Sequence, residues 1–218
     1  IMLWNSDGIK VFLDVSTYCN AGCPQCHRTE ENGLGKKDWL PLIRWDLETF
    51  SRAFPPEELR HITTFKFCGT WGDPVMCEYI IQNSFRTHIS IDTNGSIRNT
   101  EWWWDLGVLC GSRLDVVFAV DGIDQAMHEK YRRFTDLNKV LENMEMLSQT
   151  RAKAKSQTVL FAHNAEYQKE IQELVAAHGS MNHSFVISDR FQKNPDGYEK
   201  YFFTGPDGKE EYFERAPQ

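Results

Sequence analysis

The chain has 218 residues and a formal net charge of −7 at pH 7. This length suits one domain, or one domain with an appendage, that buries a sizeable core, and the net acidity argues against a nucleic-acid-binding protein. No apolar run approaches the roughly 18 residues that span a membrane, and no signal-peptide pattern opens the chain, so we expect a cytoplasmic protein with no membrane partner.

Strand-like and helix-like runs alternate along the sequence. Runs rich in β-branched and aromatic residues predict strands at 10–18, 61–67, 87–92, 114–120, 157–162 and 184–188. Capping residues and apolar positions at helical spacing predict helices after Asp46 and at 78–84, 100–110, 137–150 and 166–177.

This alternation predicts an α/β fold. Near-continuously apolar strands separated by helices indicate a parallel sheet that helices cover. Six repeats predict an open, partial (βα)6 TIM-like barrel and not a closed eightfold one. We expect residues 1–190 to form this barrel and residues 191–218 to form a C-terminal appendage or a truncated extension.

Three cysteines follow the first predicted strand in the spacing C-x3-C-x2-C: Cys19, Cys23 and Cys26. Three thiolates can hold three irons of a [4Fe–4S] cluster, which leaves the fourth iron without a protein ligand. Such an open iron is a place where a small molecule can bind and react. A structural zinc site is the alternative, although zinc usually takes four Cys or His ligands.

Polar residues recur where the predicted strands end. Besides the cysteines, these are Gly72-Asp73, Thr93-Asn94, Asp121 and His163-Asn164. In barrel-like α/β folds the carboxyl ends of the parallel strands form the rim of the active site. We therefore expect these side chains to converge at one end of the sheet.

With these motifs the chain resembles the radical S-adenosylmethionine (SAM) enzymes. The resemblance covers roughly residues 9–190 and is carried by the cysteine triplet and by three segments that follow later strands: CGTWGDP at 68–74, TNG at 93–95 and FAVDG at 118–122. The segments CPQCHRT, FAVDG and HNAEYQ look most like a phage-associated branch related to the SPASM-type peptide-modifying enzymes.

The resemblance implies a [4Fe–4S] cluster on Cys19, Cys23 and Cys26, with SAM bound at the open iron. Reductive cleavage of SAM would give methionine and a 5′-deoxyadenosyl radical, which abstracts hydrogen from an unknown substrate, either a peptide or protein or a small molecule. The electron would come from a reducing donor such as flavodoxin or ferredoxin. The protein would supply binding, orientation and exclusion of water, and no catalytic side chain is assigned.

The resemblance also implies seven further cofactor-binding residues: Gln25, Gly69, Gly72, Asp73, Thr93, Asn94 and Asp121. Of these, Gly69, Gly72 and Asp73 would line the methionine moiety, where Asp73 stands in place of the family's more usual Glu. Thr93 and Asn94 would face the ribose. Ordinary strand-end turns are the alternative, because Gly, Asp, Asn and Pro all favour turns.

The chain departs from the family at two positions. Gln25 stands where an aromatic residue usually packs near adenine, so Tyr18 or the backbone near His27 is expected to supply that contact. Ala119 stands where the fourth strand often carries a Ser that faces SAM. Asp121 is a candidate contact to SAM or substrate, and an Asp-Gly turn is its alternative.

The other cysteines are expected to be small buried hydrophobic residues: Cys68, Cys77 and Cys110. No Cys follows Cys110, so the auxiliary clusters of SPASM-type enzymes are absent or belong to an extension outside this sequence. We expect the run Trp102–Trp104 to serve packing.

A group of cationic and aromatic residues admits two interpretations: His128, Tyr131, Arg132 and Arg133. They either clamp a carboxylate or phosphate of a substrate or form a solvated helix face.

Two alternatives for the whole chain also stay open. One is a compact radical SAM enzyme acting on a small heterocycle such as a deazapurine precursor, and the other is a non-catalytic iron–sulfur or zinc-binding module.

Overall fold

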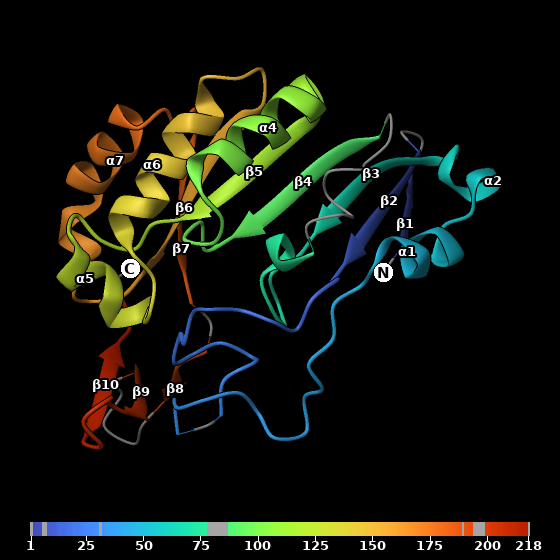
Figure 1. The fold of residues 1–218 in the computed structure, drawn as a ribbon. Helices are drawn as coiled ribbons and strands as arrows, with labels where there is room; N and C mark the ends of the chain where they lie inside the picture. The colour runs from blue at the N-terminus through green and yellow to red at the C-terminus, as the bar shows by residue number, and fades with distance from the viewer. Residues whose placement is uncertain are drawn as a thin grey trace.

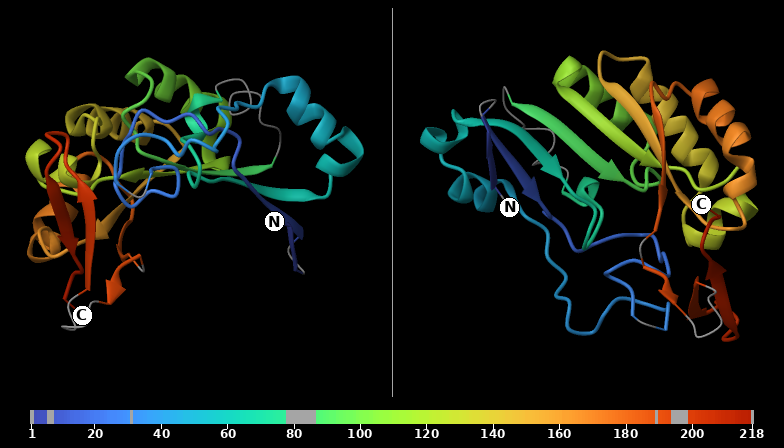
Figure 2. Two further views of the ribbon diagram at one scale, coloured as in Figure 1. Left: turned by 90° about the horizontal axis from the view of Figure 1, so that it is seen from below. Right: turned by 180° about the vertical axis from the view of Figure 1, so that it is seen from behind.

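Seven strands form one sheet in the order β1-β2-β3-β4-β5-β6-β7 in the computed structural model, which describes residues 2–5, 8–30, 32–77, 87–188, 190–193 and 199–217. The strands are β1 (Met2–Asn5), β2 (Gly8–Leu13), β3 (Ile62–Phe67), β4 (His88–Thr93), β5 (Leu114–Ala119), β6 (Lys153–Leu160) and β7 (His183–Ile187). β1 pairs antiparallel with β2, and the other six run parallel. The six parallel strands form a curled half-barrel, which confirms the predicted fold class (Figures 1 and 2).

The helices are α1 (Leu47–Ala53), α2 (Pro56–Leu59), α4 (Thr100–Cys110), α5 (Gln125–Tyr131), α6 (Leu137–Ser148) and α7 (Gln168–Ala177), with short 3-10 turns η1 (Pro74–Met76), η2 (Gly111–Arg113) and η3 (Ala165–Tyr167). Side-chain caps begin several of them: Asp46, Asn99 and Asp136 each accept a backbone N–H three residues on. The helix expected at 78–84 lies outside the described residues. No described helix is long and apolar enough to cross a membrane.

The core lies between the sheet and the helices α4 and α6, which cover one face of it (Figures 1 and 2). Trp103 and Phe118 are fully buried, with ring centroids 5.0 Å apart. The packing role predicted for the tryptophan run is confirmed for Trp102 and Trp103, whereas Trp104 is 40% exposed. Burial of large aromatic side chains of this kind is a main source of stability in a single domain.

The opposite face of the sheet carries charged side chains. Lys66 lies between the buried Phe65 and Phe67 and so points away from the core, since neighbouring side chains of a strand face opposite sides. It forms an ion pair with Asp92 of β4, and Lys155 of β6 lies 2.6 Å from the carboxylate of Asp115 on β5. These paired charges keep the inner face of the half-barrel polar.

Two predicted strands differ from the structure by more than two residues at one end. The first ends at Leu13 and not at 18, and the Asp14 carboxylate just beyond it accepts the backbone N–H of Thr70 at 3.0 Å. The fifth predicted strand begins at Lys153 and not at 157; Lys153 lies opposite Asp115, and Lys153 and Lys155 both form ion pairs with it. A pattern of apolar residues misses this part of the strand, because it contains charged residues that pair across the sheet.

The C-terminal residues form a second sheet, for which the sequence shows no clear period. It is antiparallel, in the order β10-β9-β8, with β8 (Gln192–Lys193), β9 (Glu199–Thr204) and β10 (Glu210–Glu214). Figure 1 shows it beside the loop that follows β2. The division at residue 190 into a barrel and an appendage stays a prediction.

Candidate functional site

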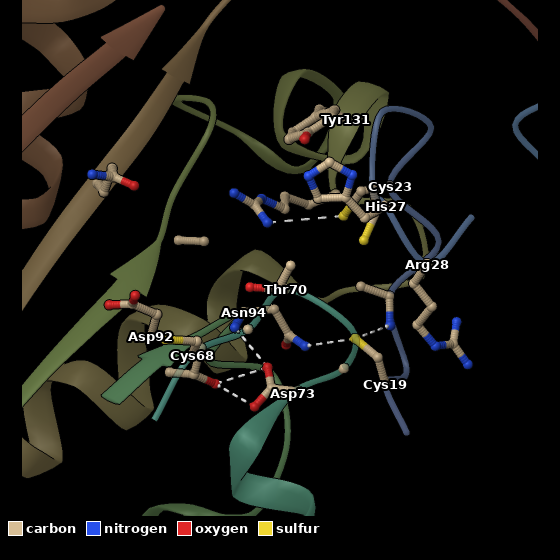
Figure 3. A pocket seen from close by; sticks show the side chains of 18 of the residues that line it. Cys19, Cys23, His27, Arg28, Cys68, Thr70, Asp73, Asp92, Asn94 and Tyr131 are labelled. Atoms are coloured by element: carbon tan, nitrogen blue, oxygen red, sulfur yellow. Dashed lines mark hydrogen bonds between the residues drawn. The ribbon is translucent and has the colours of Figure 1, made fainter. Parts of the chain in front are cut away.

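A cavity of about 480 Å³ opens beside the carboxyl ends of the strands (Figure 3). Its wall brings together eight of the predicted site residues: Cys19, Cys23, Cys26, Gly69, Gly72, Asp73, Thr93 and Asn94. The volume lies within the roughly 300–1,000 Å³ range of pockets that enclose one small ligand. The expected convergence of strand-end residues is therefore present for these eight.

The loop with the three cysteines is folded by its own backbone hydrogen bonds. The N–H of Cys26 donates to Cys23 O at 3.0 Å, and Thr29 donates from its hydroxyl to the same oxygen at 2.9 Å. All six cysteines of the chain are free thiols. The loop thus places three sulfur atoms along one wall of the cavity, as a set of thiolate ligands requires.

Burial keeps two of these thiols protonated in the absence of metal. It raises the pKa of Cys19 to about 12, and the carboxylate of Asp73 adds to this effect. It raises the pKa of Cys23 to about 11, although the guanidinium of Arg132 opposes the shift. Metal binding at these residues must therefore release protons.

Asp73 connects the loop after β3 to the end of β4. Its carboxylate accepts the Thr93 hydroxyl at 3.0 Å and the backbone N–H groups of Asn94 and Val75 at 2.8 and 3.2 Å. Burial raises the pKa of Asp73 to about 6, and these hydrogen bonds oppose the rise. The carboxylate is therefore fixed in position at the cavity wall.

Gly72 lies where two segments of backbone meet. A Cβ at this position would lie 2.4 Å from Ser16 O and 2.7 Å from Thr17 Cα, and the N–H of the next residue, Asp73, donates to Tyr18 O at 2.8 Å. Only a residue without a side chain permits this approach. Gly72 is therefore more than a turn residue, because it lets the loop after β3 pack against residues 16–18, which lead into Cys19.

Asn94 holds the first cysteine of the triplet. Its side-chain amide donates to Cys19 Sγ at 3.6 Å and to Asn20 Oδ1 at 2.9 Å, and Asn20 in turn donates to the Ser96 hydroxyl at 2.8 Å. Sequence reasoning assigned Asn94 to the ribose, and the structure places its amide against a thiol. A hydrogen bond to a ligand sulfur is one of the ways in which a protein tunes a cluster.

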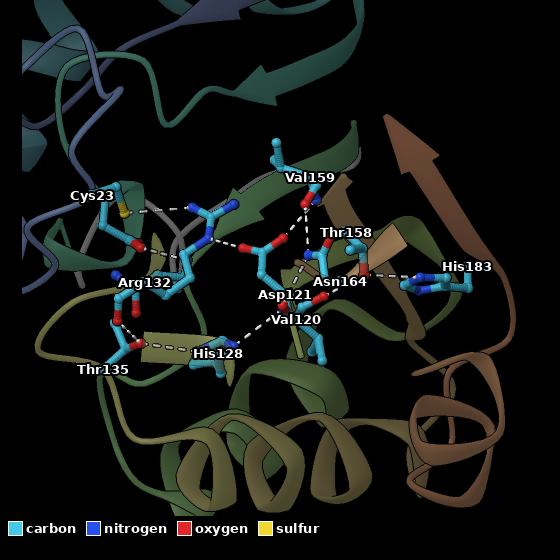
Figure 4. Close-up of polar contacts among 12 residues, drawn as sticks. Cys23, Val120, Asp121, His128, Arg132, Thr135, Thr158, Val159, Asn164 and His183 are labelled. Atoms are coloured by element: carbon cyan, nitrogen blue, oxygen red, sulfur yellow. Dashed lines mark hydrogen bonds and ion pairs between the residues drawn. The ribbon is translucent and has the colours of Figure 1, made fainter. Parts of the chain in front are cut away.

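Asp121 lies behind Arg132 and not on the cavity wall formed by the described residues (Figure 4). It is fully buried, forms an ion pair with Arg132 Nε, and accepts the Val159 N–H at 2.5 Å. Arg132 lines the cavity and reaches Cys23 Sγ at 3.9 Å. Asp121 thus faces Arg132 and not the described cavity wall, and its direct contact with SAM or substrate stays a prediction. Arg132 itself lines the cavity, and sequence reasoning named it only as part of a possible clamp.

Neither a ligand clamp nor a solvated helix face, the two interpretations of His128, Tyr131, Arg132 and Arg133, describes all four residues. His128 is buried, with Nδ1 accepting the Asp121 N–H at 3.1 Å and Nε2 lying 3.0 Å from the Thr135 hydroxyl. Burial lowers the pKa of His128 to about 4. The residue is therefore neither a clamp on a ligand nor part of a solvated face.

Gln25 also lies away from the described cavity wall. It is 3% exposed, and neither atom of its amide has a hydrogen-bond partner in the structure. Of the two substitutes expected for an adenine contact, His27 lines the cavity, whereas Tyr18 packs against the guanidinium of Arg44 at 4.7 Å. The structure thus brings His27 to the cavity, whereas the Gln25 side chain is buried and does not line it.

Several cavity residues were missed by sequence reasoning: Thr70, Asp92, Val117, Gln157 and Arg190. Cys68 also lines the cavity and is half-buried, so the expectation of a buried hydrophobic residue is wrong there and confirmed for Cys77 and Cys110. The position of Cys68 directly after a strand was the signal that could have found it. Asn164, by contrast, caps a strand end, since its amide donates to Asp121 O and Val159 O.

The donor set fits an iron–sulfur cluster. Among the described residues, no three or more His, Cys, Asp and Glu side chains are arranged to hold one metal ion. A cluster places no such demand, because each of its three thiolate ligands binds a different iron, whereas a structural zinc ion gathers its ligands around one centre. Three cysteines that line one cavity supply the three thiolates of the first arrangement.

Solved structures of radical SAM enzymes have the same fold as this chain. The anSMEcpe protein with bound AdoMet matches with a TM-score of 0.62 and 15% identity, over 85% of this chain and 55% of that one. Streptococcus suis SuiB bound to S-adenosylmethionine matches at 0.63 and 12%, over 81% and 40%. Methylornithine synthase (PylB) matches at 0.57 and 10%, over 81% and 52%.

The radical SAM fold that the sequence predicted is therefore confirmed. The chain spans about half the length of these solved proteins, or less. No family model matches the chain, and no curated protein matches it.

Proposed function

We propose that this chain is a radical SAM enzyme that holds a [4Fe–4S] cluster on Cys19, Cys23 and Cys26 and binds SAM in the adjoining cavity. The observation that supports this most directly is the arrangement of the three thiols on one cavity wall, at the carboxyl ends of a parallel half-barrel. Two structures with this fold contain the same cofactor, AdoMet in anSMEcpe and S-adenosylmethionine in SuiB.

When bound, the cluster and SAM together supply a 5′-deoxyadenosyl radical that can abstract hydrogen from a substrate. The residues of this chain bind and orient the cofactor. Asp73 offers a fixed carboxylate for the ammonium group of SAM, and Arg132 offers a guanidinium for its carboxylate. Gly69 leaves the backbone accessible at the same wall.

The buried Asp121–Arg132 pair gives this site a directed positive group. Burial opposes the charge of Arg132, but the carboxylate of Asp121 outweighs it and holds the pKa of Arg132 above its usual range. Because the Asp121 carboxylate is fully buried and is also fixed by the Val159 N–H, moving the guanidinium away would leave a buried charge without its counter-ion. Arg132 is thus positioned to bind an anionic group beside Cys23.

A peptide or protein is the substrate class that we propose. The structure of anSMEcpe with the Cp18Cys peptide and that of SuiB with the precursor peptide SuiA show peptides bound to proteins with this fold. In this chain the charged inner face of the half-barrel, with Lys66 and Asp92, adjoins the cavity and offers polar contacts to a peptide. A reducing partner such as flavodoxin or ferredoxin is proposed as the electron donor.

Anaerobic reconstitution with iron and sulfide tests the proposed function. The protein should take up four irons per chain by the cluster's stoichiometry and form 5′-deoxyadenosine from SAM when reduced. Replacing Cys23 by Ala should abolish both, whereas Cys110→Ala, in the buried helix α4, should keep both. Stoichiometric zinc, or an intact reduced cluster that forms no 5′-deoxyadenosine, would contradict the proposal.

A further inference from the structure

The C-terminal sheet contacts the cysteine loop directly. Tyr201 Oη of β9 donates to Pro24 O at 3.1 Å, and the guanidinium of Arg190 donates to Gln25 O. Both acceptors lie between Cys23 and Cys26. Farther along the same loop, Thr204 N donates to Asn32 O at 2.6 Å. The backbone between two of the proposed cluster ligands is thus held by donors from the end of the chain. Figure 1 shows the C-terminal strands beside the loop that follows β2.

A cluster of buried aromatic side chains packs beside this contact. Phe203 and Phe213, each 4% exposed, lie 4.5 Å apart between ring centroids, and Phe213 lies 4.5 Å from Phe161. The same cluster of buried residues contains Cys23 and Tyr131. The sheet therefore contributes Phe203 and Phe213 to the buried apolar cluster that contains Cys23.

Arg133 ties the loop and the sheet together at a third point. Its side chain is buried and donates to Thr204 O at 3.1 Å, and it lies 3.3 Å from the carboxylate of Glu211. Its own carbonyl accepts the N–H of Gly22, inside the cysteine loop, at 3.0 Å. At the far end of the loop, a Cβ on Gly33 would lie 2.6 Å from Phe203 Cβ, which shows how closely the two segments pack.

We propose that Tyr201 is a positioning residue for the iron–sulfur cluster, and that β9 and β10 act with it as a clasp on the cysteine loop. This inference rests on the proposed function, because it assumes that the loop holds a cluster. The clasp fixes the backbone between Cys23 and Cys26 before metal arrives and keeps water and oxygen away from Cys23. Arg133 and Glu211 secure the clasp from the sheet side.

The Tyr201→Phe variant tests the clasp, with Tyr212→Phe as the matched control. Tyr212 lies on the neighbouring strand, is 50% exposed, and packs against Phe202 and Lys200 away from the loop. Loss of one hydrogen bond to the loop should shorten the lifetime of the cluster in air by about 2- to 10-fold. The melting temperature of the metal-free protein should match that of the control.

A second variant and a second measurement keep the test decisive. Glu211→Gln should shorten the cluster lifetime by a smaller factor than Tyr201→Phe, while Glu210→Gln, an exposed neighbour, should leave it unchanged. The electron paramagnetic resonance spectrum of the reduced cluster, recorded with and without SAM, should change in Tyr201→Phe and not in Tyr212→Phe.

The outcomes distinguish the clasp from the proposed function. If the unmodified protein takes up no cluster, the proposed function fails, and the clasp fails with it. If the unmodified protein holds a cluster and cleaves SAM, the proposed function stands. The clasp is then overturned when Tyr201→Phe keeps the lifetime and spectrum of Tyr212→Phe, or loses cluster only in proportion to its loss of folded metal-free protein.

Discussion

The helix-covered sheet and the cavity wall are held together by different forces. Between the sheet and helices α4 and α6, large side chains such as Trp103 and Phe118 are fully buried. At the cavity wall the segments are irregular, and side-chain hydrogen bonds join them: the Asp73 carboxylate accepts the backbone N–H of Asn94, and the Asn94 amide donates to Cys19 Sγ. Stability should therefore depend mainly on the first region, and cofactor binding on the second.

The largest expected effect on stability comes from Trp103→Ala. Removing this fully buried ring should lower the free energy of unfolding by about 3–5 kcal/mol. Trp39→Ala, at a residue 64% exposed, should change it by less than about 0.5 kcal/mol. Urea unfolding of the metal-free protein measures both, and similar values for the two variants would contradict the division between the regions.

Acid should weaken the fold through His128. Burial lowers the pKa of His128 from 6.5 to about 4, so between these values the unfolded chain takes up a proton that the folded one excludes. The free energy of unfolding should thus fall as the pH falls from 6.5 to 4, by on the order of 3 kcal/mol from this residue.

His128→Asn isolates this effect, because Asn keeps an acceptor for the Asp121 N–H and cannot be protonated. Its unfolding free energy should depend less on pH than that of the unmodified protein. Asp73 acts in the opposite direction, since burial raises its pKa to about 6 and the folded state takes up the proton first as the pH falls. Equal slopes for His128→Asn and the unmodified protein would refute the prediction.

Gly72→Ala should damage the wall more than the core. A Cβ at 2.4 Å from Ser16 O forces the cysteine loop away from η1, at a cost of about 1–3 kcal/mol. Cluster uptake, measured as iron and sulfide per chain, should fall together with the stability. Gly69→Ala is the comparison: the nearest heavy atom to its Cβ lies at 3.4 Å, so stability should hold while SAM binding weakens.

The smallest effect on stability is expected on the inner face of the sheet. Lys66→Met breaks the ion pair with Asp92, whose side chain is 42% exposed, and should cost less than about 1 kcal/mol. Formation of 5′-deoxyadenosine without substrate should be unchanged, since Lys66 does not line the described cavity wall. Lys169→Met, which breaks an exposed pair with Glu173 on α7, serves as the control.

The parts of the molecule that the sequence predicts are those with a local signal. Each parallel strand contains an apolar run, and the cysteine triplet and Asp73 stand in the loops that follow strands, so both the sheet and eight cavity residues could be located. Cys68 stands in the same kind of position and was still misassigned, because a thiol without a motif resembles a small hydrophobic residue.

The parts that the sequence does not predict depend on contacts between distant residues. Tyr201 and Pro24 are 177 positions apart, and no periodic pattern links them. Asp121 lies where the strand-end rule placed it, yet the ion pair with Arg132, eleven positions on, turns it away from the cavity. Gln25 lies in the cysteine motif itself, yet its side chain is buried and does not line the described cavity wall, while its carbonyl accepts from the distant Arg190.

The distance along the chain between Tyr201 and Pro24 has a consequence for biosynthesis. A ribosome adds about 5–20 residues per second, so the cysteines emerge roughly ten seconds or more before the tyrosine that holds their loop. During that interval the nascent loop lacks the hydrogen bond from Tyr201, and its thiols are open to iron–sulfur carriers and to oxidants alike. Delivery of iron and sulfide therefore competes with the completion of translation.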